Sequence, residues 1–202
     1  MIALIDYQAG NLTSVRKALA AIDAQVFTPE TPDALGSASA VIVPGVGHFG
    51  ATSALTREWV DAILARVGEG RPLLGICLGM QWLYEGSEEA PDLTGLGLLG
   101  GSCRRLRPAN GAARLKVPHV GWNSLARLRD GPILEDVPDR APVYFTHSFV
   151  APLTGDTVAA TEHGETFAAV VQRGQVAGVQ FHPEKSGEVG LQILRNFVRM
   201  AG

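Results

Sequence analysis

The residue of this chain with the clearest potential for chemistry is Cys77, in the segment "PLLGICLGMQ" at residues 72–81. Residues 73–77 predict a strand that ends at this thiol, and residues 79–87 predict a helix that begins after it. Gly75 and Gly79 would permit a sharp turn and the close approach of a neighbouring segment. A helix N-terminus favours thiolate, and the N–H of Leu78 would be free to hold an oxyanion. A buried cysteine at an ordinary strand-to-helix corner is the alternative that this segment leaves open.

A second segment, "VQFHPEKS" at residues 179–186, could supply a base and a group that orients it. An apolar strand ends at His182, and Pro183 biases the backbone of His182 toward an extended conformation. His182 and Glu184 would then point to the same side of the chain. A carboxylate in that position can orient an imidazole and stabilise its protonated form. Taken alone the segment could be a surface turn, but with Cys77 it completes a nucleophile, a base and an orienting carboxylate.

A third segment, "VIVPGVGHFG" at residues 41–50, contains a G-x-G-x-x-G pattern at Gly45, Gly47 and Gly50. A dinucleotide site is one interpretation, but that fingerprint normally follows the first strand and has an acid about 20 positions later, at the end of the next strand. Here the pattern follows the third predicted strand, and Glu69 lies in a turn. A loop that lends a second N–H, from Val46 or Gly47, to the oxyanion site is the better interpretation.

A fourth segment, "KVPHVGWN" at residues 116–123, groups Lys116, His119, Trp122 and Asn123 around proline and glycine. A large ring with a hydrogen-bond donor beside a turn can pack in the core or anchor an interface. The spacing of these residues leaves both roles open.

These segments must be positioned by a mixed α/β architecture. The second half of the chain is predicted to contain short strands, a hairpin about Gly174 and a final helix at residues 186–200. The alternation of strands and helices in the first half predicts a parallel sheet with helices on both faces, extended by antiparallel strands in the second half. We expect one α/β domain over residues 1–202. The first half is predicted to hold strands at 2–6, 24–28, 40–45 and 73–77, and helices at 11–22, 52–67 and 79–87.

The overall composition excludes several classes of protein. Of the 202 residues 46% are hydrophobic and 18% charged, which suits a folded protein, and the net charge is −3. Without a basic block, we expect neither nucleic acid nor a membrane as a partner. No stretch approaches the roughly 20 apolar residues of a membrane span, and the first residues do not suggest a signal peptide. Cys77 and Cys103 form no zinc or redox pattern, so we expect a cytosolic protein with reduced thiols and no metal or cofactor.

The segments together resemble a known family. "GICLGMQ" is similar to the G-x-C-x-G-x-Q nucleophile motif of class I, triad-type glutamine amidotransferases, and "HPE" is similar to that family's His-Pro-Glu pair. More narrowly, "IDYQAGNLTSV", "PGVGHFG", "KVPHVGWN", "YFTHSF" and "QFHPEKS" resemble the glutaminase subunits of imidazole glycerol phosphate synthases. "KVPHVGWN" separates these from the anthranilate, carbamoyl-phosphate and GMP synthase relatives.

The resemblance implies a flavodoxin-like fold and a role for each matching residue. Cys77 would attack the side-chain amide of glutamine, His182 would relay the proton, and Glu184 would orient His182. Water would then hydrolyse the γ-glutamyl thioester. The oxyanion would be held by the N–H groups of Leu78 and of the Gly45–Val46–Gly47 loop. The amino-acid end of the substrate would be held by Gln81, His147, Ser148 and Phe149.

The resemblance also implies a partner, a separate cyclase subunit with a (β/α)8 barrel that would receive the ammonia. The partner would dock at the edge of the sheet that holds the active site. Two other classes stay open, a cysteine hydrolase that acts alone and a non-enzymatic dinucleotide-binding module. The candidate docking residues are Asn11, His119, Trp122, Tyr144 and Lys185.

Overall fold

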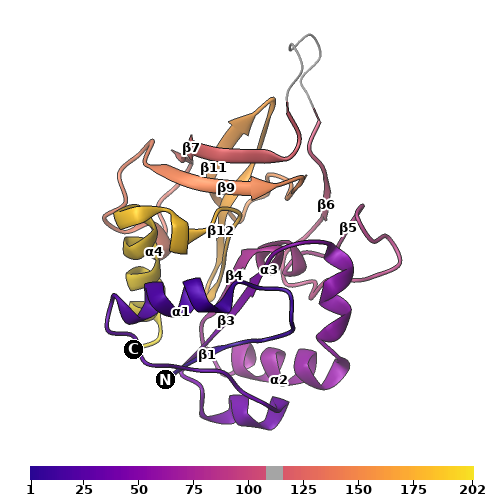
Figure 1. Ribbon diagram of the computed structural model, residues 1–202, viewed down its shortest axis with the longest axis vertical. Coiled ribbons are helices and arrows are strands. Elements are labelled where there is room, and N and C mark those ends of the chain that lie inside the picture. Colours follow the sequence, from indigo (N-terminus) through magenta and orange to yellow (C-terminus); the bar gives the residue numbers. More distant parts are fainter. Residues whose placement is uncertain (108–115) are drawn as a thin grey trace.

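The structure is a computed structural model that describes residues 1–107 and 116–202 (Figure 1). Its main sheet has eight strands in the order β2-β1-β3-β4-β13-β12-β11-β8. The first five strands in this order are parallel, and β12, β11 and β8 extend them as antiparallel neighbours. This confirms the predicted sheet. The strands are β1 (Ile2–Leu4), β2 (Val26–Phe27), β3 (Ala40–Gly45), β4 (Leu73–Cys77), β8 (Ala126–Arg127), β11 (Thr157–His163), β12 (Glu165–Arg173) and β13 (Val176–Val179).

Two smaller sheets lie beside the carboxyl ends of the parallel strands. In one, β7 (His119–Ser124) pairs antiparallel with β9 (Pro142–His147). The other has the order β10-β6-β5, with β5 (Gly86–Ser87), β6 (Ser102–Arg105) and β10 (Phe149–Val150). In Figure 1, β7 and β9 cross above the ends of β3 and β4. The run "RLKVPHVGW" at residues 114–122 also predicts a strand. Its last four residues form the start of β7, and residues 114 and 115 lie outside the described part of the chain.

Helices cover both faces of the main sheet, as predicted. One hydrophobic cluster packs α1 (Leu12–Ala20) and α4 (Gly187–Met200) against the sheet through residues such as Leu19 and Phe197. A second cluster packs α2 (Arg57–Gly68) and α3 (Leu78–Trp82) on the other face through Ile63 and Met80. Because both faces are covered, every residue of β3 and β4 is buried. The short 3-10 helices are η1 (Pro32–Ser37), η2 (Phe49–Ala54), η3 (Pro132–Leu134) and η4 (Pro183–Lys185).

Two predicted helices have different bounds in the structure. The helix expected from residue 52 begins at Arg57, because residues 49–54 form η2. The helix expected over residues 79–87 ends at Trp82. The carbonyl of Trp82 accepts the N–H of Leu96 at 2.6 Å and the carbonyl of Leu83 accepts the N–H of Leu99 at 3.0 Å, so the glycine-rich 93–101 segment takes the acceptors that a longer helix would use.

Candidate active site

Cys77 lies on a strained turn between β4 and α3. Its backbone has φ 54° and ψ −107°, a conformation that a residue with a side chain rarely adopts. The two flanking glycines permit this turn. A Cβ at residue 75 would lie 2.5 Å from the carbonyl oxygen of Gly79, and a Cβ at residue 79 would overlap the carbonyl oxygen of Val43. The structure thus has the geometry of a nucleophile elbow.

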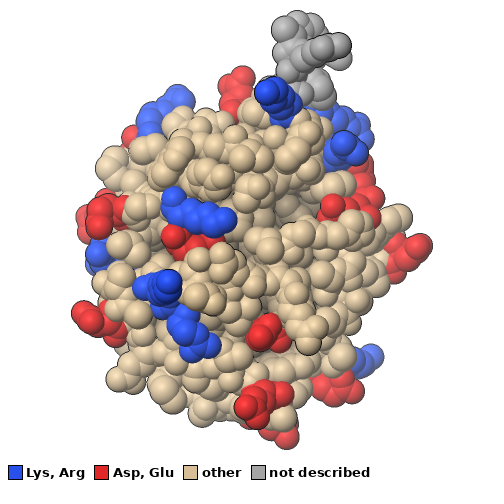
Figure 2. All heavy atoms as spheres, viewed as in Figure 1, with Lys and Arg blue, Asp and Glu red and all other residues tan. Residues whose placement is uncertain are grey.

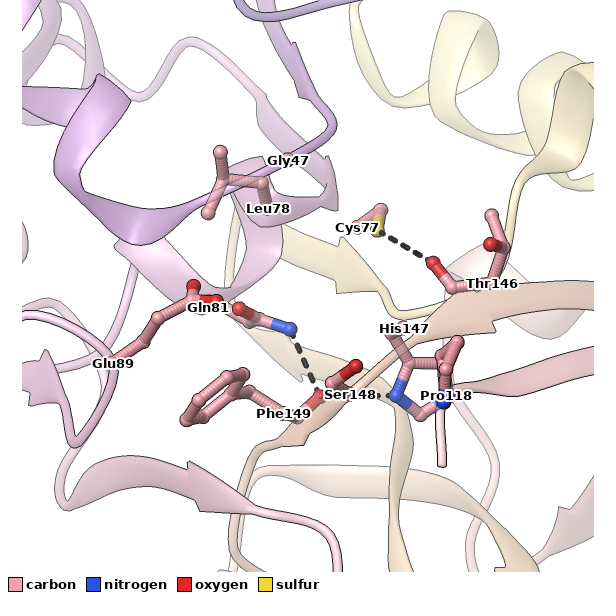
Figure 3. A pocket seen from close by; sticks show the side chains of 10 residues that line it. All are labelled: Gly47, Cys77, Leu78, Gln81, Glu89, Pro118, Thr146, His147, Ser148 and Phe149. Carbon is pink, nitrogen blue, oxygen red and sulfur yellow. Dashed lines mark hydrogen bonds between the residues drawn. The ribbon is translucent and has the colours of Figure 1, made fainter. Parts of the chain in front are cut away.

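The Cys77 thiol faces a cavity of about 230 Å³, although the residue as a whole is only 5% exposed. Its Sγ donates a weak hydrogen bond to the carbonyl of Thr146 at 3.9 Å and accepts one from Nε2 of Gln180 at 3.7 Å. Figure 3 shows the sulfur at one side of the cavity, opposite Gln81 and Glu89. The thiol is therefore reachable by a small molecule and is not enclosed in apolar packing.

His182 and Glu184 form a buried pair. Nδ1 of His182 lies 2.8 Å from Oε1 of Glu184, and the two side chains are 2% and 1% exposed. Burial lowers the pKa of His182, but its interactions with Cys77 and Glu184 outweigh this and raise the pKa to about 10. Nε2 of His182 has no hydrogen-bond partner within residues 1–107 and 116–202.

The position of Glu184 differs in one respect from the prediction. Pro183 and Glu184 lie in the η4 turn and not on extended chain. The turn still returns the carboxylate to His182, whose own backbone is extended, with φ −100° and ψ 99°. Strand β13, which precedes His182, pairs directly with β4, which ends at Cys77. This pairing brings the nucleophile and the imidazole to the same edge of the sheet.

In the loop after β3, Val46 and Gly47 are the two candidate donors to an oxyanion, but the N–H of Val46 is not free. That N–H is donated to the carbonyl of Ala9 at 2.5 Å. Gly47 has φ 95°, lines the cavity and has open space around its Cα. A Cβ at Gly45 would collide with the hydroxyl of Tyr7. The absence of a side chain at Gly45 thus lets the segment after β1, which contains Tyr7, lie close to the end of β3.

The same loop is poorly suited to a dinucleotide. The N–H of Phe49 is donated to Oε2 of Glu89 at 2.7 Å, and the N–H of Gly50 to Nδ1 of His48 at 2.9 Å. A phosphate would need these N–H groups, and it would be repelled by the carboxylate that occupies one of them. The segment that follows is the 3-10 helix η2, not the α-helix of the dinucleotide fingerprint.

The family model "Glutamine amidotransferase class-I" matches residues 3–201. The chain belongs to this family. The subunits HisH of imidazole glycerol phosphate synthase from Xanthomonas axonopodis pv. citri and Methanothermobacter thermautotrophicus are 46% and 42% identical to it. In both comparisons the alignment covers 99% of this chain and 98% of the relative.

Solved structures share the fold of this amidotransferase. A crystal structure of a glutamine amidotransferase superposes with a TM-score of 0.75 at 22% identity and covers 100% of both chains. PurLQS from Thermotoga maritima superposes with a TM-score of 0.75 at 20% identity, covering 100% of this chain and 98% of that chain. At these identities the likeness concerns the fold alone.

The predicted substrate residues of this amidotransferase do gather around the cavity. Gln81, His147, Ser148 and Phe149 line it together with Gly47, Cys77 and Leu78 (Figure 3). Nε2 of Gln81 donates to the carbonyl of Phe149 at 3.0 Å. That carbonyl lies 3.0 Å from Nδ1 of His147 as well, so the same oxygen fixes both side chains.

Sequence reasoning missed two residues of this site. Glu89 lines the cavity with a carboxylate that could bind the ammonium group of an amino acid. It lies within the acidic run "SEEAP", a composition that is typical of a solvated surface. Gln180 is fully buried and touches the thiol. Its signal was present in the sequence, because a polar residue two positions before His182 on an apolar strand points to the same side.

Three of the five predicted docking residues lie together on the surface. Trp122 is 59% exposed, its ring lies 6.0 Å from that of Tyr144, and Nζ of Lys185 lies 5.9 Å above the Tyr144 ring. Asn11 is exposed too, and its side chain accepts the N–H of Ser14 at 3.2 Å as the cap of α1. Figure 2 shows a largely uncharged surface over β7 and β9, and basic side chains on this face are interspersed with acidic ones.

The structure corrects the docking prediction for His119. Its side chain is only 3% exposed and stacks on Phe145 inside the domain. On β7 the side chains alternate, so Val120 and Trp122 face outward while His119 faces inward. The imidazole is therefore not part of the exposed surface on which Trp122 and Lys185 lie.

Within residues 1–107 and 116–202, no group of three or more His, Cys, Asp or Glu side chains is arranged to hold a metal ion. None of the helices in the described ranges has the length and apolar character needed to cross a membrane.

Proposed function

We propose that this amidotransferase is the glutaminase subunit of an imidazole glycerol phosphate synthase, in histidine biosynthesis. It hydrolyses glutamine to glutamate and ammonia and passes the ammonia to a cyclase subunit. The observation that carries the proposal is Cys77 on its strained elbow, with the buried His182–Glu184 pair at the same edge of the sheet. A relative at 46% identity over 99% of the chain carries the name of this subunit.

The geometry suggests a role for each side chain. The thiol proton of Cys77 passes to His182, and the resulting thiolate attacks the side-chain amide carbon. The tetrahedral intermediate collapses to a thioester when the nitrogen leaves as ammonia. His182, held by Glu184 and protonated through its raised pKa, donates the proton to the leaving nitrogen. It then takes a proton from the water that hydrolyses the thioester to glutamate.

The oxyanion is stabilised by backbone N–H groups. Leu78 is the first residue of α3, so its N–H has no acceptor within the helix and can donate to the oxygen. The Val46 N–H is bound to Ala9 in this structure. We infer that the Gly45–Gly47 peptides must turn before a second donor is supplied, and that binding of nucleotide by the partner promotes this turn.

The substrate is held at its amino-acid end by opposite charge and by amide contacts. Glu89 offers a carboxylate to the α-ammonium group, and Gln81 with the His147–Phe149 segment forms the facing wall. The cyclase, a separate subunit with a (β/α)8 barrel, docks on the surface formed by Trp122, Tyr144 and Lys185, with Asn11 beside it. Ammonia is readily protonated in bulk water and ammonium is not a nucleophile, so direct transfer to a docked partner conserves it.

The joint reaction turns a ribulosyl-formimino aminoimidazole carboxamide nucleotide and glutamine into imidazole glycerol phosphate, an aminoimidazole carboxamide ribotide and glutamate. We further propose that residues 1–202 act as one domain, because β12, β11 and β8 continue the parallel sheet. Both cysteines are free thiols, which fits the cytosolic location that we propose.

The decisive experiment replaces Cys77 by alanine in the complex with the cyclase. Synthesis with glutamine should be abolished, while synthesis with added ammonia should continue. Loss of both activities would overturn the proposal. Labelling with a glutamine-analogue electrophile, followed by mass spectrometry, should modify the peptide that contains Cys77 and leave Cys103 unmodified.

The regulatory step has a separate test. Gly47→Pro should change the ratio of basal to partner-stimulated glutaminase rates, because it restricts the peptide that must turn. If the isolated subunit already works at the full rate of the complex, no such switch exists. A cysteine hydrolase that acts alone would show the same full rate, and a dinucleotide-binding module would show nucleotide-dependent thermal stabilisation without thiol labelling.

A further inference from the structure

We propose that Asn123, His119 and His147 form a one-way chain of hydrogen bonds that positions the Phe149 carbonyl, and with it the wall of the glutamine cavity. His119 is then a positioning residue and not a docking residue. This inference rests on the proposed function, and it identifies residues that hold the wall of the glutamine cavity in position.

The direction of the chain follows from its fixed ends. Nδ1 of His147 lies 3.0 Å from the Phe149 carbonyl, which can only accept, so Nδ1 carries the proton and Nε2 is the acceptor. Nδ1 of His119 lies 3.1 Å from that Nε2 and must therefore donate to it. Nε2 of His119 is left as an acceptor, and the amide of Asn123 donates to it at 3.3 Å.

The orientation of the Asn123 amide is determined independently. Its Oδ1 accepts the N–H of Ser124 at 2.8 Å, and its Nδ2 donates to the carbonyl of Glu162 at 2.9 Å. The second proton of Nδ2 is thus directed to His119. Every donor in the chain meets an acceptor only if both imidazoles are neutral and carry their proton on Nδ1.

The surroundings keep both imidazoles neutral. His119 and His147 are 3% and 6% exposed. Burial, together with the other nearby histidines, lowers their pKa values to about 4 and about 3. His119 is further confined between the rings of His163 and Phe145, at centroid distances of 4.0 and 4.8 Å.

The chain ends at the reactive centre. The Phe149 carbonyl also accepts from Nε2 of Gln81, which in turn donates to Oε1 of Gln180 at 3.1 Å. Nε2 of Gln180 donates to the sulfur of Cys77. Figure 3 shows Gln81, His147 and Phe149 converging beside the thiol. Loss of the His119 donor would leave the buried Nε2 of His147 without a partner and free the segment that faces the substrate.

The first test reads the proton positions without using activity. NMR correlations between ring nitrogens and ring protons should show His119 and His147 protonated on Nδ1 in the full-length protein. His163 should be protonated on Nε2, because that atom lies 3.0 Å from the carbonyl of Lys116. Protonation of His119 or His147 on Nε2 would overturn the proposal.

The second test measures glutamine hydrolysis in the complex with the cyclase. His119→Phe keeps the aromatic stacking and removes both hydrogen bonds. It should raise KM for glutamine about tenfold, as expected for loss of the buried His119–His147 hydrogen bond, which is the one of the two that leads to the cavity. The kcat should stay within about threefold of wild type. His119→Gln retains a donor and an acceptor and should recover most of the loss. His163→Phe is the matched control and should leave both constants unchanged.

The outcomes distinguish failure of the positioning role of His119 from failure of the proposed function. An unchanged KM in His119→Phe, or an equal rise in His163→Phe, would refute the positioning role. If His119→Phe does not fold, the proton positions and the His119→Gln variant still decide the matter. A wild-type complex without glutaminase activity would refute the proposed function while leaving the hydrogen-bond chain to be judged by NMR.

Discussion

Replacing Gly79 by alanine tests the geometry of the nucleophile elbow most directly. A Cβ at this position would lie 1.8 Å from the carbonyl oxygen of Val43 in β3, whereas ordinary contacts begin near 3.4 Å. The start of α3 and the neighbouring strand would have to separate by about 1.6 Å. The obstacle is backbone, so no side-chain rotation can relieve it.

A displacement of this size should affect both rate and stability. The moved segment carries the Leu78 N–H and Gln81, and a shift of about 1 Å in a catalytic group can cost about 100-fold in rate. Overpacking costs about 1–3 kcal/mol of unfolding free energy, and more when backbone must move. We expect a loss of about 3 kcal/mol, which for a chain of this length corresponds to a fall in Tm of roughly 6–12 °C.

A graded set of alanine variants makes the test quantitative. Gly75→Ala would place a Cβ 2.5 Å from the Gly79 carbonyl oxygen, and Gly178→Ala would place one 2.7 Å from the flexible side chain of Met80. At Gly68, which ends α2, nothing lies within 4 Å, and alanine should be neutral or stabilising there by about 0.5–1 kcal/mol.

The assays are thermal unfolding and the rate of Cys77 labelling by a glutamine-analogue electrophile. The order of damage should be Gly79→Ala, then Gly75→Ala, then Gly178→Ala, with Gly68→Ala harmless. A Gly79→Ala protein with the stability and labelling rate of wild type would show that the close contact between residue 79 and the Val43 carbonyl does not constrain the elbow.

Buried ionisable and polar groups can be tested by substitution and by chemical labelling. The interactions of His182 with Cys77 and with the carboxylate of Glu184 raise the pKa of His182 to about 10. Glu184→Gln should therefore lower this pKa and move the alkaline limb of the kcat profile to lower pH. An unmoved limb would argue against this role of the carboxylate. Burial raises the pKa of the Cys103 thiol far above its usual range, so alkylation of the folded protein followed by peptide mapping should find Cys77 modified first; earlier labelling of Cys103 would contradict this. Asn196→Ala removes hydrogen bonds of 3.0 and 2.7 Å to two backbone carbonyls and should cost about 2 kcal/mol in urea unfolding. A loss comparable to that of the more exposed Gln192→Ala would contradict this prediction.

The parts of the site that sequence alone predicted depend on neighbouring residues. The elbow at Cys77 needs a strand, a thiol and two flanking glycines within a few positions, and the structure has them in that arrangement. The pairing of His182 with Glu184 is likewise local, and it forms even though the turn differs from the extended chain expected. Short-range sterics and hydrogen bonds are encoded in adjacent residues, so they can be inferred without a fold.

Other features depended on strand pairing and on which face of a strand meets the core. Cys77 and His182 are 105 positions apart and meet because β13 pairs in parallel with β4. Whether His119 faced a partner or the interior was decided by the packing of β7 on Phe145 and His163. Glu89 lies in the site because its carboxylate accepts the N–H of Phe49, which follows the loop after β3.

The amino-acid sequence thus determined which chemical groups this protein has and their local geometry. Tertiary structure decided which of those groups meet and which are hidden from solvent. The physical reason is that a strand's register and inward face are set by the packing of the whole core, to which distant segments contribute together. No short pattern contains that information.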